Sequence, residues 1–346
     1  MVESTIIGLD VAKQIFQVHG VSADGKVTVK RKLRRSEVLG FFGRLGRCTV
    51  GLEACGGSHF WAREIGALGH EVRLIPPAYV KPYVERGKTD AVDAEAICEA
   101  VSRPTMRFIP IKTAECQAAL MVLKSRDLLV RQRTQAINAV RGHLAELGIV
   151  AAKGLAKVGT LIAIVRDEND QRLPPAARTA LKLLAEQIEV LTERVDTLGR
   201  EIVAEVRRDD TMRRLTTIPG IGPITAATIQ ALVPDPGAFT SGRHFAAWIG
   251  LTPKMHSSGG NERLGKISKM GNPALRSLLV VGATAVLLHA RRGATISPWL
   301  TALLARRPAK VVAIALANKM ARIVWALLTK GGTFMRKNPA AMRAAA

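Results

Sequence analysis

A heptad seam in the middle of the chain is the feature that most constrains the fold. Apolar residues recur there at alternating spacings of three and four: Leu181, Leu184, Ile188, Leu191, Val195, Leu198 and Ile202. A stripe this narrow, with Glu and Arg beside it, predicts a long helix that pairs with another helix as a coiled coil. One amphipathic helix packed on its own domain is the alternative. The pattern leaves open whether the partner is a helix expected over residues 113–147 or a second subunit.

Before the seam, short apolar segments alternate with helical ones. Strands are expected over residues 5–10, 15–21, 26–33, 48–53 and 71–75, and helices over 37–46, 59–69 and 90–101. The order β-β-β-α-β-α-β-α predicts an α/β domain with a mixed sheet over residues 1–110.

The rest of the chain reads as mostly helical. A basic helix and the coiled coil form a connector over residues 111–210, in which residues 150–175 are less regular. A helical region with Gly-rich interruptions follows over 211–336, and the tail 337–346 is expected to fray.

The charge balance points to a polyanionic partner. The 346 residues include 51 Lys and Arg against 28 Asp and Glu, a formal net charge of +23. Self-repulsion of that size is relieved by binding nucleic acid. Aromatic residues are only 4% of the chain, so base stacking on aromatic platforms is not expected to be the main binding device.

Several other classes are disfavoured. The four cysteines form no CxxC pair, which argues against a zinc finger or a disulfide framework and fits a reducing, cytoplasmic setting. The longest apolar run, residues 278–288, is too short to span a bilayer, and the N-terminus lacks signal-peptide features. No membrane partner is therefore expected.

Four carboxylates occupy positions typical of a metal site. Asp10 and Glu53 each close an apolar strand, and Asp90 and Asp93 share one face of an expected helix. Convergent carboxylates resist full ionisation, a conflict that Mg²⁺ or Mn²⁺ removes. Taken singly, each residue could be a strand end, a helix N-terminal acid or an exposed charge. In this order and in a basic chain, they match the ribonuclease-H-like arrangement of metal nucleases.

Two loops in the last region could contact phosphates. Gly220 and Gly222 lie in an apolar-Pro-Gly-Ile-Gly-Pro turn that looks like a helix-hairpin-helix DNA-binding element, or else a plain bend between helices. Residues 254–276 surround the Ser257-Ser258-Gly259-Gly260 turn with Lys254, Arg263, Lys266, Lys269 and Arg276 and only one acid, Glu262. A serine there could act as a nucleophile, although such loops are usually only flexible.

The helix expected over 113–147 is a candidate RNA surface. Its basic residues are Lys124, Arg126, Arg131, Arg133 and Arg141. A solvated basic face without a ligand is the alternative interpretation.

Several motifs together resemble one family. They are GLDVAK (8–13), GLEACGG (51–57), KTDAVDAEAI (88–97), IPGIGP (218–223) and AAWIGLTPKMHSSGG…GKISKMGNPALR (246–276). In combination and order they resemble transposases of the insertion-sequence "one-ten" family. The GLEACGGSHFWAR stretch is more similar to its "one-one-one-one" subgroup. The resemblance covers nearly the whole chain.

This resemblance implies the fold and the site residues. It implies an N-terminal RuvC-like domain, a coiled-coil connector and a C-terminal transposase domain. The family's acidic tetrad falls on Asp10, Glu53, Asp90 and Asp93, which would bind Mg²⁺. The catalytic serine precedes a glycine, which selects Ser258 with Ser257 as runner-up and leaves Ser241 structural.

The implied activity is recombination of donor and target DNA through a serine-phosphodiester intermediate. A noncoding RNA from the element would guide it, and the bacterial enzyme would work as a homo-oligomer, a dimer or a tetramer. The physics of RNA-guided recognition is compatible with this. The rival interpretations are a junction-resolving metal nuclease with water as nucleophile and a non-catalytic nucleic-acid scaffold.

Overall fold

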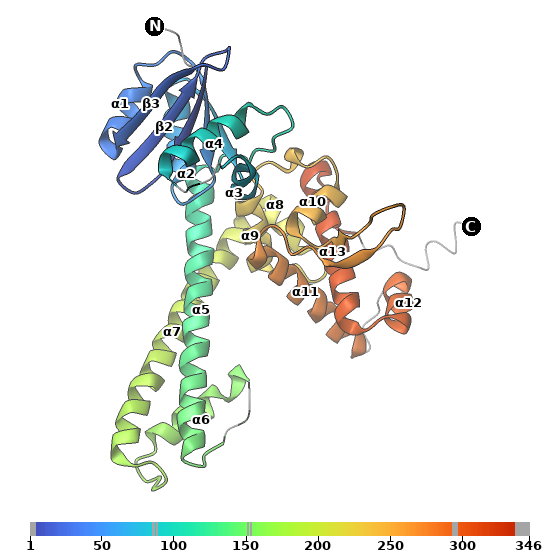
Figure 1. Cartoon of the computed structure of the whole chain (residues 1–346). Helices are drawn as coiled ribbons and strands as arrows, with labels where there is room; N and C mark the ends of the chain where they lie inside the picture. The colour runs from blue at the N-terminus through green and yellow to red at the C-terminus, as the bar shows by residue number, and fades with distance from the viewer. Residues whose placement is uncertain are drawn as a thin grey trace, which may run out of the picture. The chain divides into compact units, whose positions relative to one another are not determined.

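The chain folds into two compact units, Met1–Gln117 and Ala118–Ala346. The computed structural model describes residues 5–84, 87, 89–150, 152, 154–292 and 297–335, so the predicted tail lies outside the described residues. The boundary between the units falls inside α5 (Ala114–Glu146), the long helix seen in Figure 1.

The first unit is built on a five-stranded mixed sheet, as the sequence predicts. Its strands are β1 (Ile6–Asp10), β2 (Ile15–Val21), β3 (Val27–Arg34), β4 (Thr49–Glu53) and β5 (Glu71–Ile75). Their order is β3-β2-β1-β4-β5. The β1–β2 and β2–β3 pairs are antiparallel, whereas β1–β4 and β4–β5 are parallel.

Helices cover both faces of this sheet. They are α1 (Val38–Phe42), α2 (Ser58–Ala67), α3 (Pro77–Val80) and α4 (Asp90–Ser102), with short 3₁₀ turns at Arg35–Glu37 and Lys81–Tyr83. Phe42 and Trp61 pack on one face with Ile7 and Leu9, while Ile97 of α4 packs on the other. The helix expected over 37–46 ends at Phe42, before Gly43.

Two glycines let α4 lie directly on the sheet. A Cβ at Gly8 would come within 2.5 Å of the Cys98 amide nitrogen, and one at Gly51 would lie 2.8 Å from the Val101 Cβ. Residues with side chains at these two positions would force α4 away from β1 and β4. The close approach fixes where the first turn of α4 sits relative to the strand ends.

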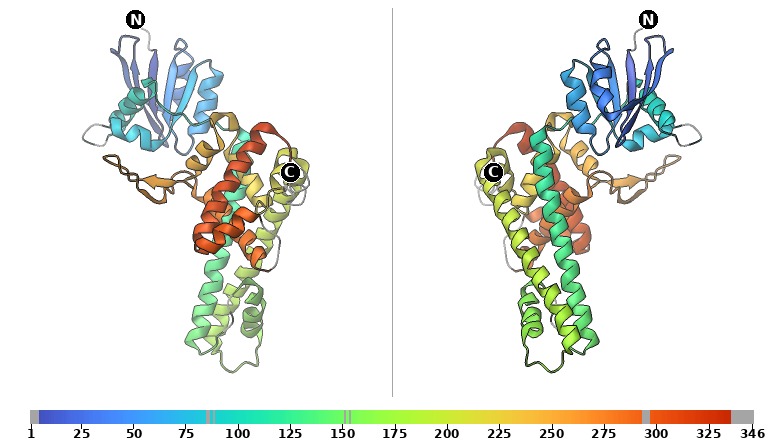
Figure 2. Two further views of the ribbon diagram at one scale, coloured as in Figure 1. Left: turned by 90° about the vertical axis from the view of Figure 1, so that its right-hand side faces the viewer. Right: turned by 90° about the vertical axis from the view of Figure 1, so that its left-hand side faces the viewer.

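The apolar seam predicted over residues 181–202 packs in part against another helix of the same chain. Helix α7 (Pro175–Arg208) lies beside α5 in both Figure 1 and Figure 2. Leu181 and Ile188 of α7 share a buried cluster with Ile137 and Leu144 of α5. Within the chain, the N-terminal part of the seam thus packs against the helix expected over 113–147.

The segment over residues 150–175 is more regular than expected. It contains a 3₁₀ turn at Leu155–Lys157 and helix α6 (Val158–Arg166). Leu161 and Val165 of α6 are buried in the same cluster as the α5 and α7 residues. Val158, Leu161 and Val165 are spaced three and four residues apart, a pattern that could have predicted helix α6.

The remaining helices form a second core. They are α8 (Asp210–Thr216), α9 (Pro223–Leu232), α10 (Gly242–Ile249), α11 (Pro273–Arg291), α12 (Pro298–Arg306) and α13 (Ala309–Lys330), with a 3₁₀ turn at Pro236–Ala238. Strands β6 (Pro253–Met255) and β7 (Leu264–Ile267) form an antiparallel hairpin between α10 and α11, which the sequence analysis did not predict.

Two of these helices are long and apolar enough to cross a membrane by length and composition alone, contrary to the expectation from residues 278–288. In α11 and α13, 22% and 39% of the most apolar window are buried. Leu279 and Ala283 of α11 nevertheless pack with Val312 and Met320 of α13 in the core of the second unit. Core helices of soluble proteins pass the same test, so these two are not clear membrane spans.

Candidate functional site

The three aspartates of the predicted tetrad meet at one edge of the sheet. Asp10 ends β1, while Asp90 and Asp93 occupy the first turn of α4. Thr89 caps this helix by accepting a hydrogen bond from the Val92 amide, 3.3 Å away. One carboxylate oxygen from each aspartate lies within 4.8 Å of the others. The glycine contacts of α4 with the sheet thus bring Asp90 and Asp93 to Asp10.

Glu53 belongs to the same electrostatic environment. It ends β4, which pairs in parallel with β1 so that Leu52 lies opposite Leu9. The strand ends therefore place Glu53 next to Asp10 in the sheet. Its charge is one of those that act on Asp10.

The ionisation of Asp10 is opposed by its surroundings. Burial, followed by the charges of Asp93, Asp90 and Glu53, raises the pKa of this carboxyl to about 6 from 3.8. Asp10 and Asp93 are half-buried and Asp90 is exposed. Carboxylate oxygens that are close together and repel one another suit a hard divalent cation. The residues present therefore fit a metal of the Mg²⁺ or Mn²⁺ type.

The predicted nucleophile lies at the tip of the β6–β7 hairpin. Ser258 pairs with Asn261 across a turn in which Gly259 and Gly260 have φ of +56° and +82°. Positive φ at both central positions is what a tight type I′ hairpin turn requires. All residues from Pro253 to Lys266 are exposed, so the tip is open to solvent. The turn thus closes a β-hairpin, for which Gly-Gly was a usable signal.

The two serines have different local roles. The Ser257 hydroxyl accepts a hydrogen bond from the Arg263 amide across the hairpin, 3.2 Å away. Within the described part of the chain, the Ser258 hydroxyl has no hydrogen-bond partner. Ser241 caps α10 by accepting from the His244 amide at 3.2 Å, in keeping with a structural role.

The basic side chains in the segment 254–276 fall into two groups, exposed ones and one that is bonded to the backbone. Lys254, Arg263, Lys266 and Lys269 are exposed on or beside the hairpin. Arg276 instead donates hydrogen bonds to the carbonyls of Ile249 and Met270, both at 2.9 Å. Arg276 therefore stabilises the segment that precedes α11 and is less available to a phosphate.

The basic residues of α5 also divide. Lys124 and Arg131 are exposed, whereas Arg126 and Arg141 are half-buried. Arg133 is only 9% exposed. It lies one helical turn before Ile137 of the cluster shared with α7, and its burial leaves little of it open to a ligand.

Close packing and backbone conformation require a glycine at position 220. A Cβ at this residue would lie 2.7 Å from the carbonyl oxygen of Gly282 in α11, and its φ is +89°. Gly222, which is exposed, precedes α9 without a side-chain cap. The turn therefore holds α8 and α9 against α11, and only its outer side is open to a phosphate.

The acidic cluster and the serine hairpin belong to different compact units. The cluster lies in residues 1–117 and the hairpin in residues 118–346. Sequence analysis singled out the residues of both but not the fold of the hairpin.

Comparisons with known proteins agree with these features. Residues 7–149 match a family model described as a transposase with a DEDD motif of the IS110 type, and residues 212–297 match the model "Transposase IS116/IS110/IS902 family".

Relatives with similar sequences cover almost the whole chain. A "Probable family 20 transposase" of Pseudomonas aeruginosa is 50% identical over 94% of this chain and 96% of its own. The transposase for insertion sequence element IS1111A of Coxiella burnetii is 39% identical over 96% and 92%. The transposase for IS1328 of Yersinia enterocolitica is 38% identical over 96% and 99%. With its acidic cluster and these relatives, the chain belongs to the IS116/IS110/IS902 family of transposases, in its 1111 subgroup, and is a DNA recombinase that catalyses phosphoryl transfer.

Proposed function

We propose that this transposase exchanges DNA strands through a covalent link between Ser258 and a DNA phosphate. The observation that carries the proposal is the exposed Ser258 hydroxyl, which the hairpin holds among cations without a hydrogen bond of its own within the described residues. Lys254 of β6 and Arg263, which directly precedes β7, would neutralise the approaching phosphodiester. Ser257 is the less suitable nucleophile because its oxygen already accepts the Arg263 amide proton.

The covalent step transfers a phosphoryl group without hydrolysis. The Ser258 Oγ forms a bond to phosphorus and releases its proton, while one phosphorus–deoxyribose oxygen bond breaks and that oxygen takes up a proton. A hydroxyl of another DNA strand then attacks the phosphoserine, reforms a phosphodiester and returns the serine. No external energy source is needed because the number of phosphodiester bonds is conserved.

Asp10, Glu53, Asp90 and Asp93 would hold Mg²⁺, with Mn²⁺ as a substitute. The ion would withdraw charge from the phosphate and stabilise the leaving oxygen. The cluster and the serine come from separate units, so we propose a composite active site, completed by a second subunit if the units of one chain do not meet. We also propose that the protein works as a homo-oligomer, a dimer or a tetramer. The α7 seam packs against α5 within the chain and therefore gives no evidence for it.

We also propose that a noncoding RNA of the element guides the choice of donor and target DNA. The exposed Lys124 and Arg131 of α5 support an RNA surface, to which the buried Arg133 cannot contribute. Sequencing the RNA that copurifies with the protein tests this. No RNA above background would contradict it.

The finer fold assignments belong to the same proposal. The sheet order and the acidic edge support a RuvC-like domain over residues 1–110, and α5 with α7 supports a coiled-coil connector over 111–210. The turn between α8 and α9 supports a helix-hairpin-helix element in a transposase domain over 211–336.

Trapping the adduct tests the nucleophile. Whole protein is incubated with the element's DNA ends, copurifying RNA and Mg²⁺, denatured, digested and analysed by mass spectrometry. A nucleotide-linked peptide is expected from wild type and from Ser257→Ala, and none from Ser258→Ala. An adduct that survives in Ser258→Ala would show that the assignment is wrong.

The acidic cluster alone would also suit a junction-resolving metal nuclease with water as nucleophile. That alternative predicts cut ends in the same experiment and no adduct in any variant. A non-catalytic scaffold predicts neither, and it predicts that Asp10→Asn leaves every activity intact.

A further inference from the structure

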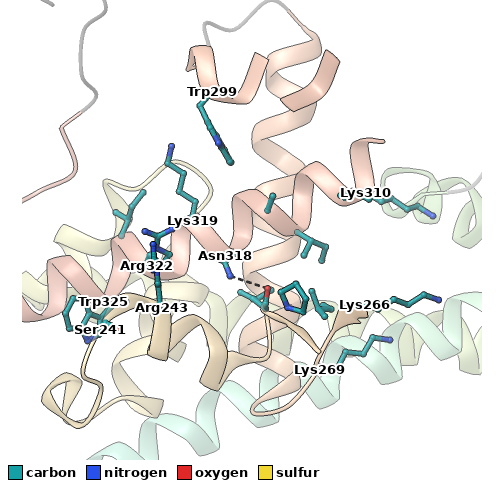
Figure 3. Close-up of a pocket in the computed structure, with 18 of the residues that line it drawn as sticks. Ser241, Arg243, Lys266, Lys269, Trp299, Lys310, Asn318, Lys319, Arg322 and Trp325 are labelled. Atoms are coloured by element: carbon teal, nitrogen blue, oxygen red, sulfur yellow. Dashed lines mark hydrogen bonds between the residues drawn. The ribbon is translucent and has the colours of Figure 1, made fainter. Parts of the chain in front are cut away.

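A groove of about 1630 Å³ lies in the second unit, beside the base of the serine hairpin. The N-terminus of α10, the hairpin strands, α12 and α13 line it (Figure 3). Its volume exceeds the roughly 300–1,000 Å³ of typical small-molecule pockets. A groove of this size and openness suits a segment of a polymer better than a small ligand.

The charges around the groove have a single sign. Its cations are Arg243, Lys266, Lys269, Lys310, Lys319 and Arg322. Among its lining residues in the described part of the chain there is no Asp or Glu. The chain itself contains no acidic residue after Glu262. Figure 3 shows Lys266, Lys269 and Lys310 on one side of the view and Arg243 and Arg322 on the other, so the cations lie along the groove and not at one point.

The floor between these cations is apolar and carries an aromatic ring. Val311 of α13, which contributes to the floor, is 52% exposed. Trp299 of α12 is 38% exposed, and the Lys319 Nζ lies 4.2 Å from its ring centroid. In Figure 3 this ring projects from α12 toward α13. An exposed ring within a row of cations offers a base a surface to stack on while its phosphates are neutralised.

The neutral polar side chains of the lining are already engaged. Asn318 donates to the Leu251 carbonyl at 3.2 Å, and Ser241 accepts the His244 amide proton. One hydrogen bond each ties these side chains to the fold, and the lining holds few other neutral polar groups that could read base edges or a 2′-hydroxyl. What the groove offers is charge for phosphates and apolar surface for base faces, which in a duplex are hidden by stacking.

From these observations we infer that the groove binds a single-stranded segment of DNA, without sequence preference, next to the serine hairpin. The inference deepens the proposed function, on which it rests for the need to hold an unpaired strand. From Pro253 at the groove to Ser258 at the tip, the strand rise gives about 17 Å. A strand held in the groove would thus reach the nucleophile within a few nucleotides.

Binding measurements with the full chain test the aromatic part. We expect Trp299→Ala to weaken binding of fluorescent (dT)20 about fivefold and to change affinity for a 20-base-pair duplex less than twofold. Trp299→Phe keeps a stacking surface and should recover most of the loss. Equal losses for both DNAs, or no loss for (dT)20, would overturn the inference. So would a groove-dependent affinity for (rU)20 that exceeds that for (dT)20.

A pair of charge variants provides the matched control. Lys310→Ala with Arg322→Ala should lower the salt slope of (dT)20 binding by about 1.4, because two phosphate contacts are lost. Arg200→Ala with Arg207→Ala removes two exposed cations from α7 and should leave that slope unchanged. If the salt slope falls equally in both pairs, the groove is only part of a diffuse basic surface and the inference is wrong.

Crosslinking provides a readout that does not depend on folding of a variant. Wild-type protein irradiated with (dT)20 carrying 5-iododeoxyuridine should yield a crosslinked peptide that contains Trp299. Crosslinks confined to other regions would contradict the inference. Because Ser258→Ala should bind (dT)20 normally, failure of the groove and failure of the serine nucleophile are separable outcomes.

Discussion

At the scale of single residues, Asp10 is a carboxyl whose ionisation is opposed both by burial and by neighbouring charges. Its neighbours raise the pKa of the carboxyl to about 6, because both partial burial and the charges of Asp93 and Asp90 disfavour the ionised form. Without a cation, the charged form therefore destabilises the folded chain at neutral pH. When a divalent cation binds, its attraction to the carboxylates outweighs their mutual repulsion.

The stability of the metal-free protein should reflect this conflict. The folded state keeps the Asp10 proton to a higher pH than the unfolded state, so the free energy of unfolding should fall as pH rises from about 4 to about 6. In EDTA at pH 7, Asp10→Asn should raise that free energy by on the order of 1 kcal/mol after screening. Urea unfolding at pH 7 and pH 4 measures it.

An exposed aspartate serves as the control. Ser22 and Lys26 hold the pKa of Asp24 below its usual value, so Asp24→Asn should not stabilise the protein at pH 7. Added Mg²⁺ should stabilise wild type and leave Asp10→Asn nearly unchanged. If Asp10→Asn destabilises the metal-free protein, the assigned repulsion is wrong.

At the scale of elements, two contacts organise the molecule: α4 on the sheet, and α5 on α7. The first depends on Gly8 and Gly51, and the second packs Ile137 of α5, one helical turn after the buried Arg133, with Ile188 of α7. Both contacts decide which charged side chains reach solvent or the acidic cluster.

The glycine contact predicts a large effect from one methyl group. Gly8→Ala should destabilise the protein by about 1–3 kcal/mol, because the new Cβ collides with the α4 backbone near Cys98. It should also reduce DNA cleavage by displacing Asp90 and Asp93. Gly40→Ala in α1 meets nothing within 4 Å and should be neutral or slightly stabilising. Similar urea midpoints for the two variants would contradict this account.

The seam predicts that two neighbouring arginines behave differently. Arg131→Leu should lower the salt slope of nucleic-acid binding by about one, because it removes an exposed cation that the proposed RNA surface would set against a phosphate. Arg133→Leu should leave the slope unchanged and raise stability by about 1 kcal/mol, because it replaces a buried charge with an apolar side chain. A loss of binding in Arg133→Leu alone would place this residue on the binding surface after all.

Local patterns predicted the regular elements well and the irregular ones poorly. The β5 strand and the α4 helix follow from apolar alternation and from Thr89 with its following acids. Helix α6 was missed because its apolar residues sit between polar loops. The groove was not predictable, since Arg243, Trp299 and Lys310 come from separate segments that only tertiary packing brings together.

At the scale of the whole molecule, the two units have separate cores and separate chemistry. The acidic cluster lies in the first, whereas the serine hairpin and the basic groove lie in the second. Under the proposed function, the excess of +23 has a distribution: cations of the second unit would hold phosphates, and the acidic cluster of the first would hold a metal.

Separate cores predict separate unfolding. Calorimetry of the metal-free protein should resolve two transitions, of which Mg²⁺ raises only the one assigned to the first unit, because the acidic cluster of the described residues lies in that unit. Gly8→Ala should lower the same transition. A shift of both transitions by Mg²⁺ would contradict the assignment of the metal to the first unit alone.

The fate of water oxygen during strand exchange tests the central claim most directly. The reaction of whole protein, copurifying RNA, DNA ends and Mg²⁺ is run in oxygen-18 water, and the phosphates at the exchanged junctions are analysed by mass spectrometry. Transfer through Ser258 predicts no label in the rejoined phosphodiesters, since only serine and deoxyribose oxygens attack phosphorus. Cut ends whose phosphates carry oxygen-18, with no unlabelled rejoined product, would contradict it and establish hydrolysis.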